Sequence, residues 1–118
     1  MPTLNELIEF QKKFDKNYGL DWSNLSKEQK IEKLSRIAVA LSGEIGEFCN
    51  LVKKVLREYD RTGKLPDEDM NEKLREELTD IFIYILKAAG QLLGMDLEKW
   101  YFEKMNYNAR RFEKYKTS

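Results

Sequence analysis

Two short acidic motifs carry the residue types and the spacing that divalent-cation chemistry requires. Glu44 and Glu47 lie three residues apart in an apolar stretch, and Glu77 and Asp80 repeat that spacing further along the chain. Residues three apart share one face of a helix, so each motif would direct two carboxylates to the same place. The chain has no histidine, and a ligand set of carboxylate oxygens suits Mg²⁺, or Mn²⁺, ions that usually bridge protein carboxylates to substrate phosphates. The motifs therefore predict a magnesium site that acts on phosphates.

The opposing interpretation is that these acids are ordinary solvated residues that pair with lysines beside a core. Two features favour the site. Both pairs border apolar seams, where an unpaired carboxylate would be costly or take up a proton. In addition, Gly43 and Gly46 interrupt the helix of the first motif, although glycine there costs about 1 kcal/mol relative to alanine. Access of a ligand to the backbone would explain the two glycines, and close helix packing is their other interpretation.

The composition excludes several classes of catalytic site. Without histidine, the chain has no Ser-His-Asp or Cys-His triad, no histidine-ligated zinc and no Glu-x-x-His di-iron motif. Cys49 is the only cysteine, which excludes an internal disulfide and a thiolate zinc cluster. We expect it to be a small core residue rather than a nucleophile. A chain of 118 residues with 42% apolar content can form one compact domain.

Charge and hydropathy limit the expected partners. Lys plus Arg equals Asp plus Glu at 21 each, so no overall field attracts the chain to nucleic acid or anionic lipid. The longest apolar run, 81–86, is too short to span a bilayer, and the amino-terminal segment has no secretory pattern. We therefore expect a cytoplasmic protein that binds neither nucleic acid nor membrane.

Capping residues and apolar periodicity predict four helices. The expected spans, each from a capping residue to a stop signal, are 3–19, 26–63, 67 or 69 to 94, and a last helix that starts at 96. No stretch alternates for long enough with the period of two that is typical of a strand. The sequence thus predicts one all-α domain over residues 1–118, built as a four-helix bundle.

The second and third predicted helices carry long apolar seams, whose members alternate three and four residues apart. In the second helix the seam comprises Ile31, Leu34, Ala38, Leu41, Ile45, Phe48, Val52, Val55 and Tyr59, and in the third it comprises Leu74, Leu78, Ile81, Ile85, Ala88 and Leu92. These seams and the apolar residues beside them exceed what one small bundle readily buries. We expect a homo-oligomer, at least a dimer.

Four short motifs follow one another between about residue 31 and residue 112. They are Leu41-Ser42-Gly43-Glu44-Ile45-Gly46-Glu47-Phe48, Lys53-Lys54, Glu76-Glu77-Leu78-Thr79-Asp80-Ile81 and Lys104-Met105-Asn106-Tyr107-Asn108-Ala109-Arg110-Arg111-Phe112. In their order and separations they resemble the MazG-type all-α nucleoside triphosphate pyrophosphohydrolases. The chain departs from that family at Gly43, where a second acid is frequent, and at Arg111, where lysine is frequent.

This resemblance implies Mg²⁺-dependent hydrolysis of a (deoxy)nucleoside triphosphate to the monophosphate and pyrophosphate, in nucleotide pool control or house-cleaning. It implies a helical bundle assembled as a dimer or a dimer of dimers, in which side chains of one subunit approach the acids of another. The implied metal ligands are Glu44, Glu47, Glu77 and Asp80. The positions associated with the triphosphate or sugar are Lys54, Lys104, Asn108 and Arg111.

Under this interpretation, Glu44 or Glu47 would accept the proton of the water that attacks the α-phosphorus of the triphosphate. Trp22 could stack on a base, or it could cap the core between the first two helices. Without the acidic cluster, the stripe formed by residues 104, 108 and 111 would be a solvated basic face near a helix carboxyl end.

Two alternatives remain open. The first is a non-catalytic oligomeric helical module that binds a metal or a partner. The second, within the same fold, is a more dedicated enzyme such as a dimeric dUTPase or a phosphoribosyl-ATP pyrophosphohydrolase. Release of pyrophosphate from triphosphates separates an enzyme from a module, and capture of a single nucleotide would indicate the dedicated enzyme.

Overall fold

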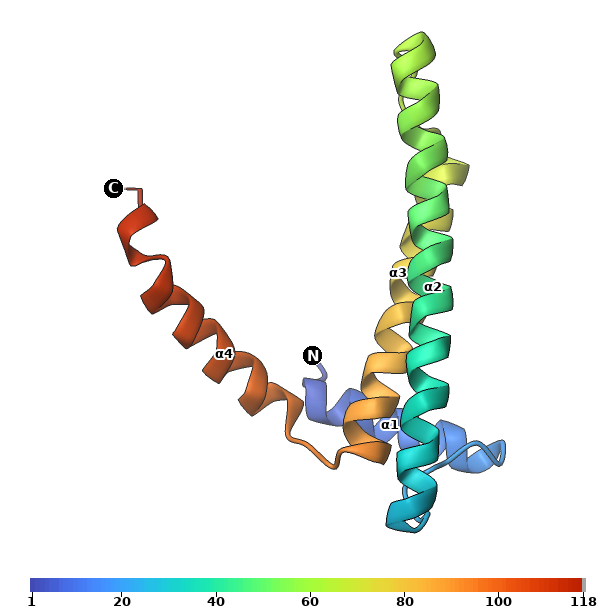
Figure 1. The fold of residues 1–118 in the computed structure, drawn as a ribbon, viewed down its shortest axis with the longest axis vertical. Coiled ribbons are helices and arrows are strands. Elements are labelled where there is room, and N and C mark those ends of the chain that lie inside the picture. The colour runs from blue at the N-terminus through green and yellow to red at the C-terminus, as the bar shows by residue number, and fades with distance from the viewer. Residues whose placement is uncertain (118) are drawn as a thin grey trace.

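The computed structural model describes residues 1–117, so Ser118, the last residue of the predicted domain, lies outside the described residues. Helices account for all the regular structure in this part of the chain, which confirms the all-α prediction. The elements are α1 (Leu4–Asn17), α2 (Lys27–Thr62), α3 (Glu68–Lys87), the π-helical turn η1 (Ala88–Leu92), α4 (Leu97–Arg111) and the 3₁₀ turn η2 (Glu113–Tyr115), as Figure 1 shows.

The helix starts coincide with the capping residues expected from the sequence. A side-chain oxygen at each of these positions accepts a hydrogen bond from a backbone N–H three residues on, which satisfies a donor that the helix leaves free. The four caps are Thr3, Ser26, Asp67 and Asp96. Asp67 rather than Asp69 therefore begins α3. Gly63 ends α2 in the left-handed conformation, at φ +71°.

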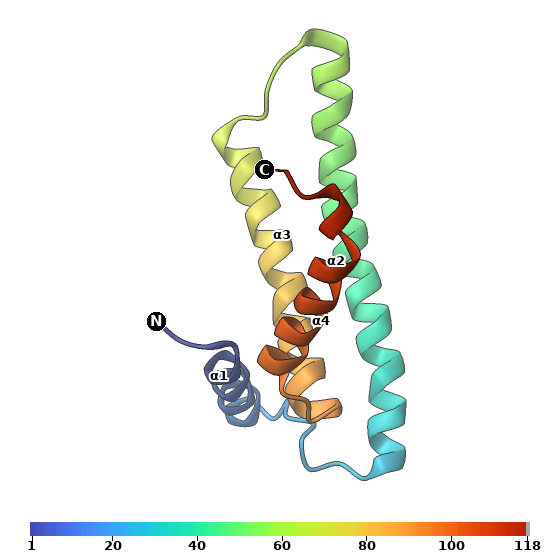
Figure 2. The same ribbon diagram turned by 90° about the vertical axis from the view of Figure 1, so that its left-hand side faces the viewer.

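α2 and α3 form an antiparallel pair of unequal lengths. α2 has 36 residues and α3 has 20. The connector between them runs back along α2 before α3 begins, as Figure 2 shows. Consequently the middle of α2, which carries Glu44, lies beside the first half of α3, which carries Glu77. The two acidic motifs can meet only because the chain runs back along α2 in this way.

The buried core lies at one end of this pair, where α1 crosses it (Figure 1). Its buried apolar residues are Ile8, Ile37, Leu86, Ala89 and Leu92. Away from that end, the predicted seams are only partly covered. α3 packs against one face of α2, and no other element of residues 1–117 covers the neighbouring face of α2 there. Ile45 is 47% exposed and Tyr59 is 51% exposed. The seams are therefore not a continuous core within a single chain.

α4 departs from the α2–α3 pair instead of packing along it (Figure 1). The chain bends by 111° between the segment Glu68–Leu92 and α4. α1 holds the start of α4: the backbone N–H of Leu4 donates to Oε1 of Glu98 at 2.9 Å, and Nδ2 of Asn5 donates to Oδ1 of Asp96 at 3.2 Å. Within one chain the four helices thus form an antiparallel pair, a crossing helix and a projecting arm.

None of the helices in the described chain is long and apolar enough by itself to cross a membrane. The bent pair formed by Glu68–Leu92 and Leu97–Arg111 meets that test by length and composition alone.

Candidate metal and phosphate site

Three of the four predicted acids converge where α2 and α3 face each other. One carboxylate oxygen from each of Glu44, Glu77 and Asp80 lies within 4.8 Å of the other two. All three residues are partly buried. Spacing of i, i+3 on α3 and antiparallel packing against α2 produce this arrangement, as the sequence predicted for helices that pack together.

Glu44, Glu77 and Asp80 are called the acidic trio below. Two of the carboxylate oxygens in this trio have no hydrogen-bond partner. Oε2 of Glu44 and Oε2 of Glu77 are buried and accept no hydrogen bond from residues 1–117. Burial raises the pKa of the Glu77 carboxyl to about 7, together with the nearby carboxyl groups of Glu44 and Glu47. A buried acceptor without a donor is costly, so the trio requires a proton or a cation.

Glu47 occupies a different position from the trio. It is exposed, yet close enough to Glu77 to contribute to the raised pKa of that carboxyl. With Glu77, it lines an open groove of about 270 Å³ between α2 and α3, to which Lys54 and Lys73 also contribute. The structure therefore places Lys54, a predicted phosphate-binding residue, in the same groove as two of the acids.

The predicted ligand-binding residues of α4 are not brought to the trio within one chain. Lys104 and Arg111 lie over the ring of Tyr107, with the charged groups 4.9 Å and 5.7 Å from its centroid. Asn108 approaches only Sδ of Met105, at 4.0 Å. Because α4 projects away from the α2–α3 pair (Figure 1), these side chains cannot reach a ligand at the trio of their own chain.

Trp22 lies at the other end of the α2–α3 pair, in a polar network. Its backbone N–H donates to Oε1 of Gln91 at 3.0 Å, and Nζ of Lys87 lies 4.2 Å from the centroid of its ring. Lys33 is also near the ring, at 5.2 Å. The rise of an α-helix puts Lys33 about 16 Å from Glu44 along α2. These contacts support the interpretation that Trp22 caps the core, and they do not place it beside the acids.

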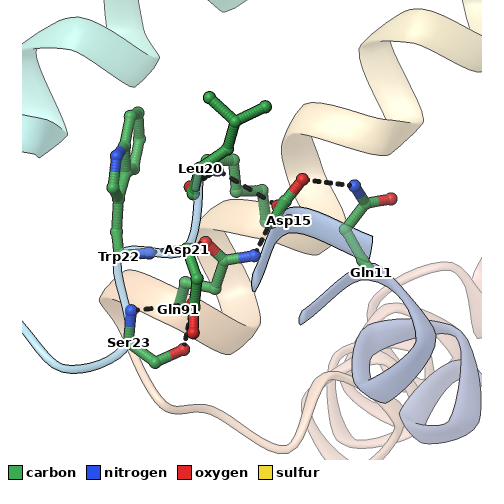
Figure 3. A network of polar contacts seen from close by, with 8 residues as sticks. Gln11, Asp15, Leu20, Asp21, Trp22, Ser23 and Gln91 are labelled. Carbon is green, nitrogen blue, oxygen red and sulfur yellow. Dashed lines mark hydrogen bonds and ion pairs between the residues drawn. The ribbon is translucent and has the colours of Figure 1, made fainter. Parts of the chain in front are cut away.

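This network is the main feature that sequence reasoning missed. Asp15, Lys87 and Gln91 are all buried, and Figure 3 shows the side chains of Asp15 and Gln91 turned toward each other. Asp15 accepts hydrogen bonds from Lys87 at 3.1 Å and from Gln91 at 2.6 Å. The signal that could have found it is Asp15 itself, which lies seven residues after Ile8 and so shares its apolar face.

One further expectation is corrected. Cys49 is exposed and is not a small core residue. Its neighbour Phe48, a member of the predicted seam, is partly buried, and successive side chains on an α-helix point about 100° apart, so Cys49 lies off that seam.

The trio suits a hard divalent cation. Its donors are carboxylate oxygens alone, and two of them are buried without partners. Mg²⁺ and Mn²⁺ prefer such ligands, and either ion would offset the burial and the repulsion that together raise the pKa of Glu77. The residues present therefore fit the predicted magnesium site.

The chain is similar to a phage protein over about half of its length. No family model matches the chain. Over 62 residues the chain is 42% identical to a protein named Gene 37 protein from Mycobacterium phage L5. The match covers 52% of this chain and 52% of the phage protein, so the chain spans about half the length of that relative. The name of the phage protein states no activity.

Proposed function

We propose that this protein is a magnesium-dependent hydrolase that converts a (deoxy)nucleoside triphosphate to the monophosphate and pyrophosphate. The observation that carries the proposal is the acidic trio: three carboxylates from two helices lie within 4.8 Å, and two of their oxygens are buried without partners. The resemblance of the motifs to MazG-type pyrophosphohydrolases supplies the reaction and the substrate class. The cell compartment in this proposal is the cytoplasm, and the working unit is a homo-oligomer.

The three members of the trio hold the metal. Glu44 contributes from α2, and Glu77 and Asp80 contribute from α3, so the fold rather than a flexible loop sets their separation. When bound, Mg²⁺ neutralises charge that develops on phosphate oxygens and favours ionisation of water near it. Mn²⁺ has similar ligand preferences and would substitute.

Glu47 is the proton acceptor in this proposal. It is exposed and stands outside the trio, so its carboxylate remains free to take a proton from the water that attacks the α-phosphorus. Pyrophosphate then leaves with the electrons of the broken P–O bond. Glu44 was the other candidate, but its buried Oε2 is better used as a metal ligand.

The position of Lys54 indicates on which side of the groove the triphosphate would lie. Its ammonium group lines the groove that Glu47 and Glu77 share, where it would attract phosphate oxygens as a flexible point charge. The leaving pyrophosphate would therefore lie toward the connector end of the α2–α3 pair.

Pyrophosphate release from a panel of ordinary and modified triphosphates tests the function. With Mg²⁺, the protein should turn over at least one of them, and Glu47→Gln and Asp80→Asn should each lower kcat by about 100-fold or more. Glu72→Gln, which changes an exposed acid of α3 outside the trio, is the matched control and should retain activity. A full panel without turnover, in Mg²⁺ and in Mn²⁺, would reject the proposal.

The alternative is a non-catalytic oligomeric module that binds a metal or a partner. The extensive exposed apolar surface of the chain favours it, because such surface is typical of proteins that work through association. Under this alternative, changes of the trio to amides alter metal-dependent stability, and triphosphates remain intact.

A further inference from the structure

A second cavity adjoins the candidate phosphate site. It measures about 150 Å³ and lies where the last turns of α2 and the first turn of α3 face the connector, residues 63–67, which arches from one helix to the other (Figure 2). We call it the connector cavity. Lys54 lines both this cavity and the groove that contains Glu47 and Glu77, so the two spaces meet at one side chain. The proposed reaction leaves the connector cavity without a role.

The walls of the connector cavity are largely apolar. Three elements contribute to them, through Val55 of α2, Leu65 and Pro66 of the connector, and Met70 of α3. Leu65 is 70% exposed, so a ligand in the cavity would cover apolar surface that now faces water. Pockets for drug-sized ligands measure about 300 Å³ or more. The connector cavity can therefore take a single flat ring system but not a whole nucleotide.

Charged side chains at the edge of the connector cavity limit what can occupy it. Glu58 and Asp67 line it, and both would repel a phosphate group inside it. Each already has one partner: Glu58 accepts a hydrogen bond from Arg61 at 3.0 Å, and Asp67 accepts one from the backbone N–H of Met70 at 2.9 Å. A carboxylate has further acceptor sites, which can bind the N–H groups of a nucleobase. Apolar walls with acceptors at the edge suit a base rather than an anion.

Two lysines lie where a phosphate chain would enter the connector cavity. Lys64 lines it together with Lys54, and neither forms an ion pair within residues 1–117. The rise of an α-helix puts Lys54 about 10 Å beyond Glu47 along α2, and Glu58 about 16 Å beyond it.

This order along α2 determines how a base in the connector cavity would be attached. In the proposed function the α-phosphorus lies at Glu47, and the leaving phosphates extend toward Lys54. The base of an ordinary triphosphate is joined on the other side of the α-phosphorus and points away from the cavity. A base in the cavity must therefore be joined to the far end of the phosphate chain.

We propose that the substrates include dinucleoside polyphosphates, whose second base occupies the connector cavity. The water that attacks the α-phosphorus forms a new P–O bond and gives one proton to Glu47. The bond from this phosphorus to the bridging oxygen breaks, and its electron pair leaves with the rest of the phosphate chain. A dinucleoside tetraphosphate thus yields one nucleoside monophosphate and one nucleoside triphosphate. This proposal rests on the proposed function for the reaction, but occupation of the cavity can be measured without turnover.

Hydrolysis rates test the substrate class. With Mg²⁺, symmetrical dinucleoside tetraphosphates of the common bases are compared with the corresponding triphosphates, and the products are separated by chromatography. At least one tetraphosphate should give monophosphate and triphosphate in equal initial amounts. Its kcat/KM should exceed that of its triphosphate by at least about tenfold, because the second base adds binding energy. Turnover of triphosphates without this advantage overturns the proposal.

Leu65→Asp tests the cavity itself. A charge on the apolar wall should remove the advantage of the tetraphosphate and leave kcat/KM for the triphosphate unchanged. Leu93→Asp is the matched control, since it adds the same charge at another exposed leucine that does not line the cavity, and it should keep the advantage. If Leu65→Asp lowers both rates equally, the cavity holds the base of the triphosphate itself, which overturns the proposal.

Methyl NMR measures occupation of the cavity independently of turnover. Of the four methionines, Met70 alone lines the connector cavity, and Met70→Leu identifies its signal. Methylene-bridged analogues of the tetraphosphates, added with Mg²⁺, should shift the Met70 methyl signal more than the matching triphosphate analogues do, and the Met95 signal should not move. Equal responses to the two kinds of analogue overturn the proposal. A protein that cleaves no nucleotide but shows the Met70 shift with the dinucleoside analogue alone would reject the proposed function and retain the cavity as a nucleoside site.

Discussion

Proton binding at Glu77 links the acidic trio to the stability of the metal-free protein. The pKa of its carboxyl is about 7 in the folded chain, against 4.5 for an ordinary glutamate, mainly because of burial and also because of Glu44 and Glu47. Between these values the folded state holds a proton that the unfolded state has released. The free energy of unfolding should therefore fall as the pH rises from about 4.5 to about 7, and change little from this group above that range.

Thermal unfolding across this pH range, in the presence of a chelator, measures the effect. Glu77→Gln should remove the decline, because an amide stays neutral at every pH, and it should raise the melting temperature at pH 8. Glu72→Gln should leave the decline unchanged. Mg²⁺ competes with the proton, so it should stabilise the wild-type protein more at pH 8 than at pH 5. A metal-free protein whose stability rises steadily through this range would contradict the description of the trio.

A second prediction concerns the buried ion pair between Lys87 and Asp15. The side chains are 9% and 5% exposed, and Nζ lies 3.1 Å from Oδ2. Lys87 also donates to the carbonyl of Leu20 and faces the ring of Trp22. Lys87→Met would leave a buried carboxylate without its cation, so we expect a loss of about 3 kcal/mol in the free energy of unfolding.

Denaturant unfolding gives this value, and an exposed ion pair provides the control. Arg36 and Glu32 are paired at 3.3 Å, but both side chains are more than half exposed, so Arg36→Met should cost less than about 1 kcal/mol. Replacing both buried partners, as Asp15→Leu with Lys87→Met, should recover part of the loss because no charge is then left unpaired. Equal costs for Lys87→Met and Arg36→Met would mean that the buried pair contributes no more to the stability of the fold than the exposed pair does.

At the scale of the helices, the sequence predicted boundaries well because they are set by local chemistry. The side chain of Thr3 or Ser26 caps a backbone N–H within three residues of itself. The start of each helix can therefore be predicted without knowledge of the fold. The meeting of Glu44 with Glu77 and Asp80 was also predictable, since periodicity fixes the faces and an antiparallel pair brings them together. Nothing more distant than a neighbouring helix is involved.

The direction of α4 was not predictable in the same way. It depends on a π turn at Ala88–Leu92, on Gly94, and on hydrogen bonds from α1, whose donors are more than 90 residues away in the sequence. The spacing of Lys104 and Arg111 shows that they share a face, but not where that face lies relative to the acids. The buried network around Lys87 was missed for a similar reason, because charge suggests solvent unless a distant partner is known.

The close contact of α1 with the π turn provides a prediction about these elements. A Cβ added at Gly90 would clash with Cγ2 of Ile8, a buried core side chain. Gly90→Ala should therefore destabilise the protein by about 1 to 3 kcal/mol through overpacking, although alanine favours helix. Circular dichroism during denaturant unfolding gives the value.

Gly43→Ala is the matched control, since a Cβ there meets no atom of the described chain within 4 Å. It should be neutral or stabilise α2 by up to about 1 kcal/mol. A loss at Gly43 would report contact with a second copy rather than strain within the chain. No loss at Gly90 would mean that α1 does not approach the π turn as closely as the structure describes.

At the scale of the whole molecule, the proposed assembly should depend on an exposed apolar stripe of α3, which Leu78, Phe82 and Ile85 form at helical spacing. Leu78 is exposed in the single chain, and covering one leucine side chain contributes about 2 kcal/mol. Because a two-fold interface would contain that position twice, Leu78→Lys should raise the dissociation constant of the proposed dimer by at least about tenfold. Thr79→Lys adds the same charge one residue away, at an exposed position outside the stripe, and should change the constant far less. Light scattering over a dilution series measures both variants. A wild-type protein that remains monomeric at micromolar concentration would show that this apolar stripe is not an interface between copies.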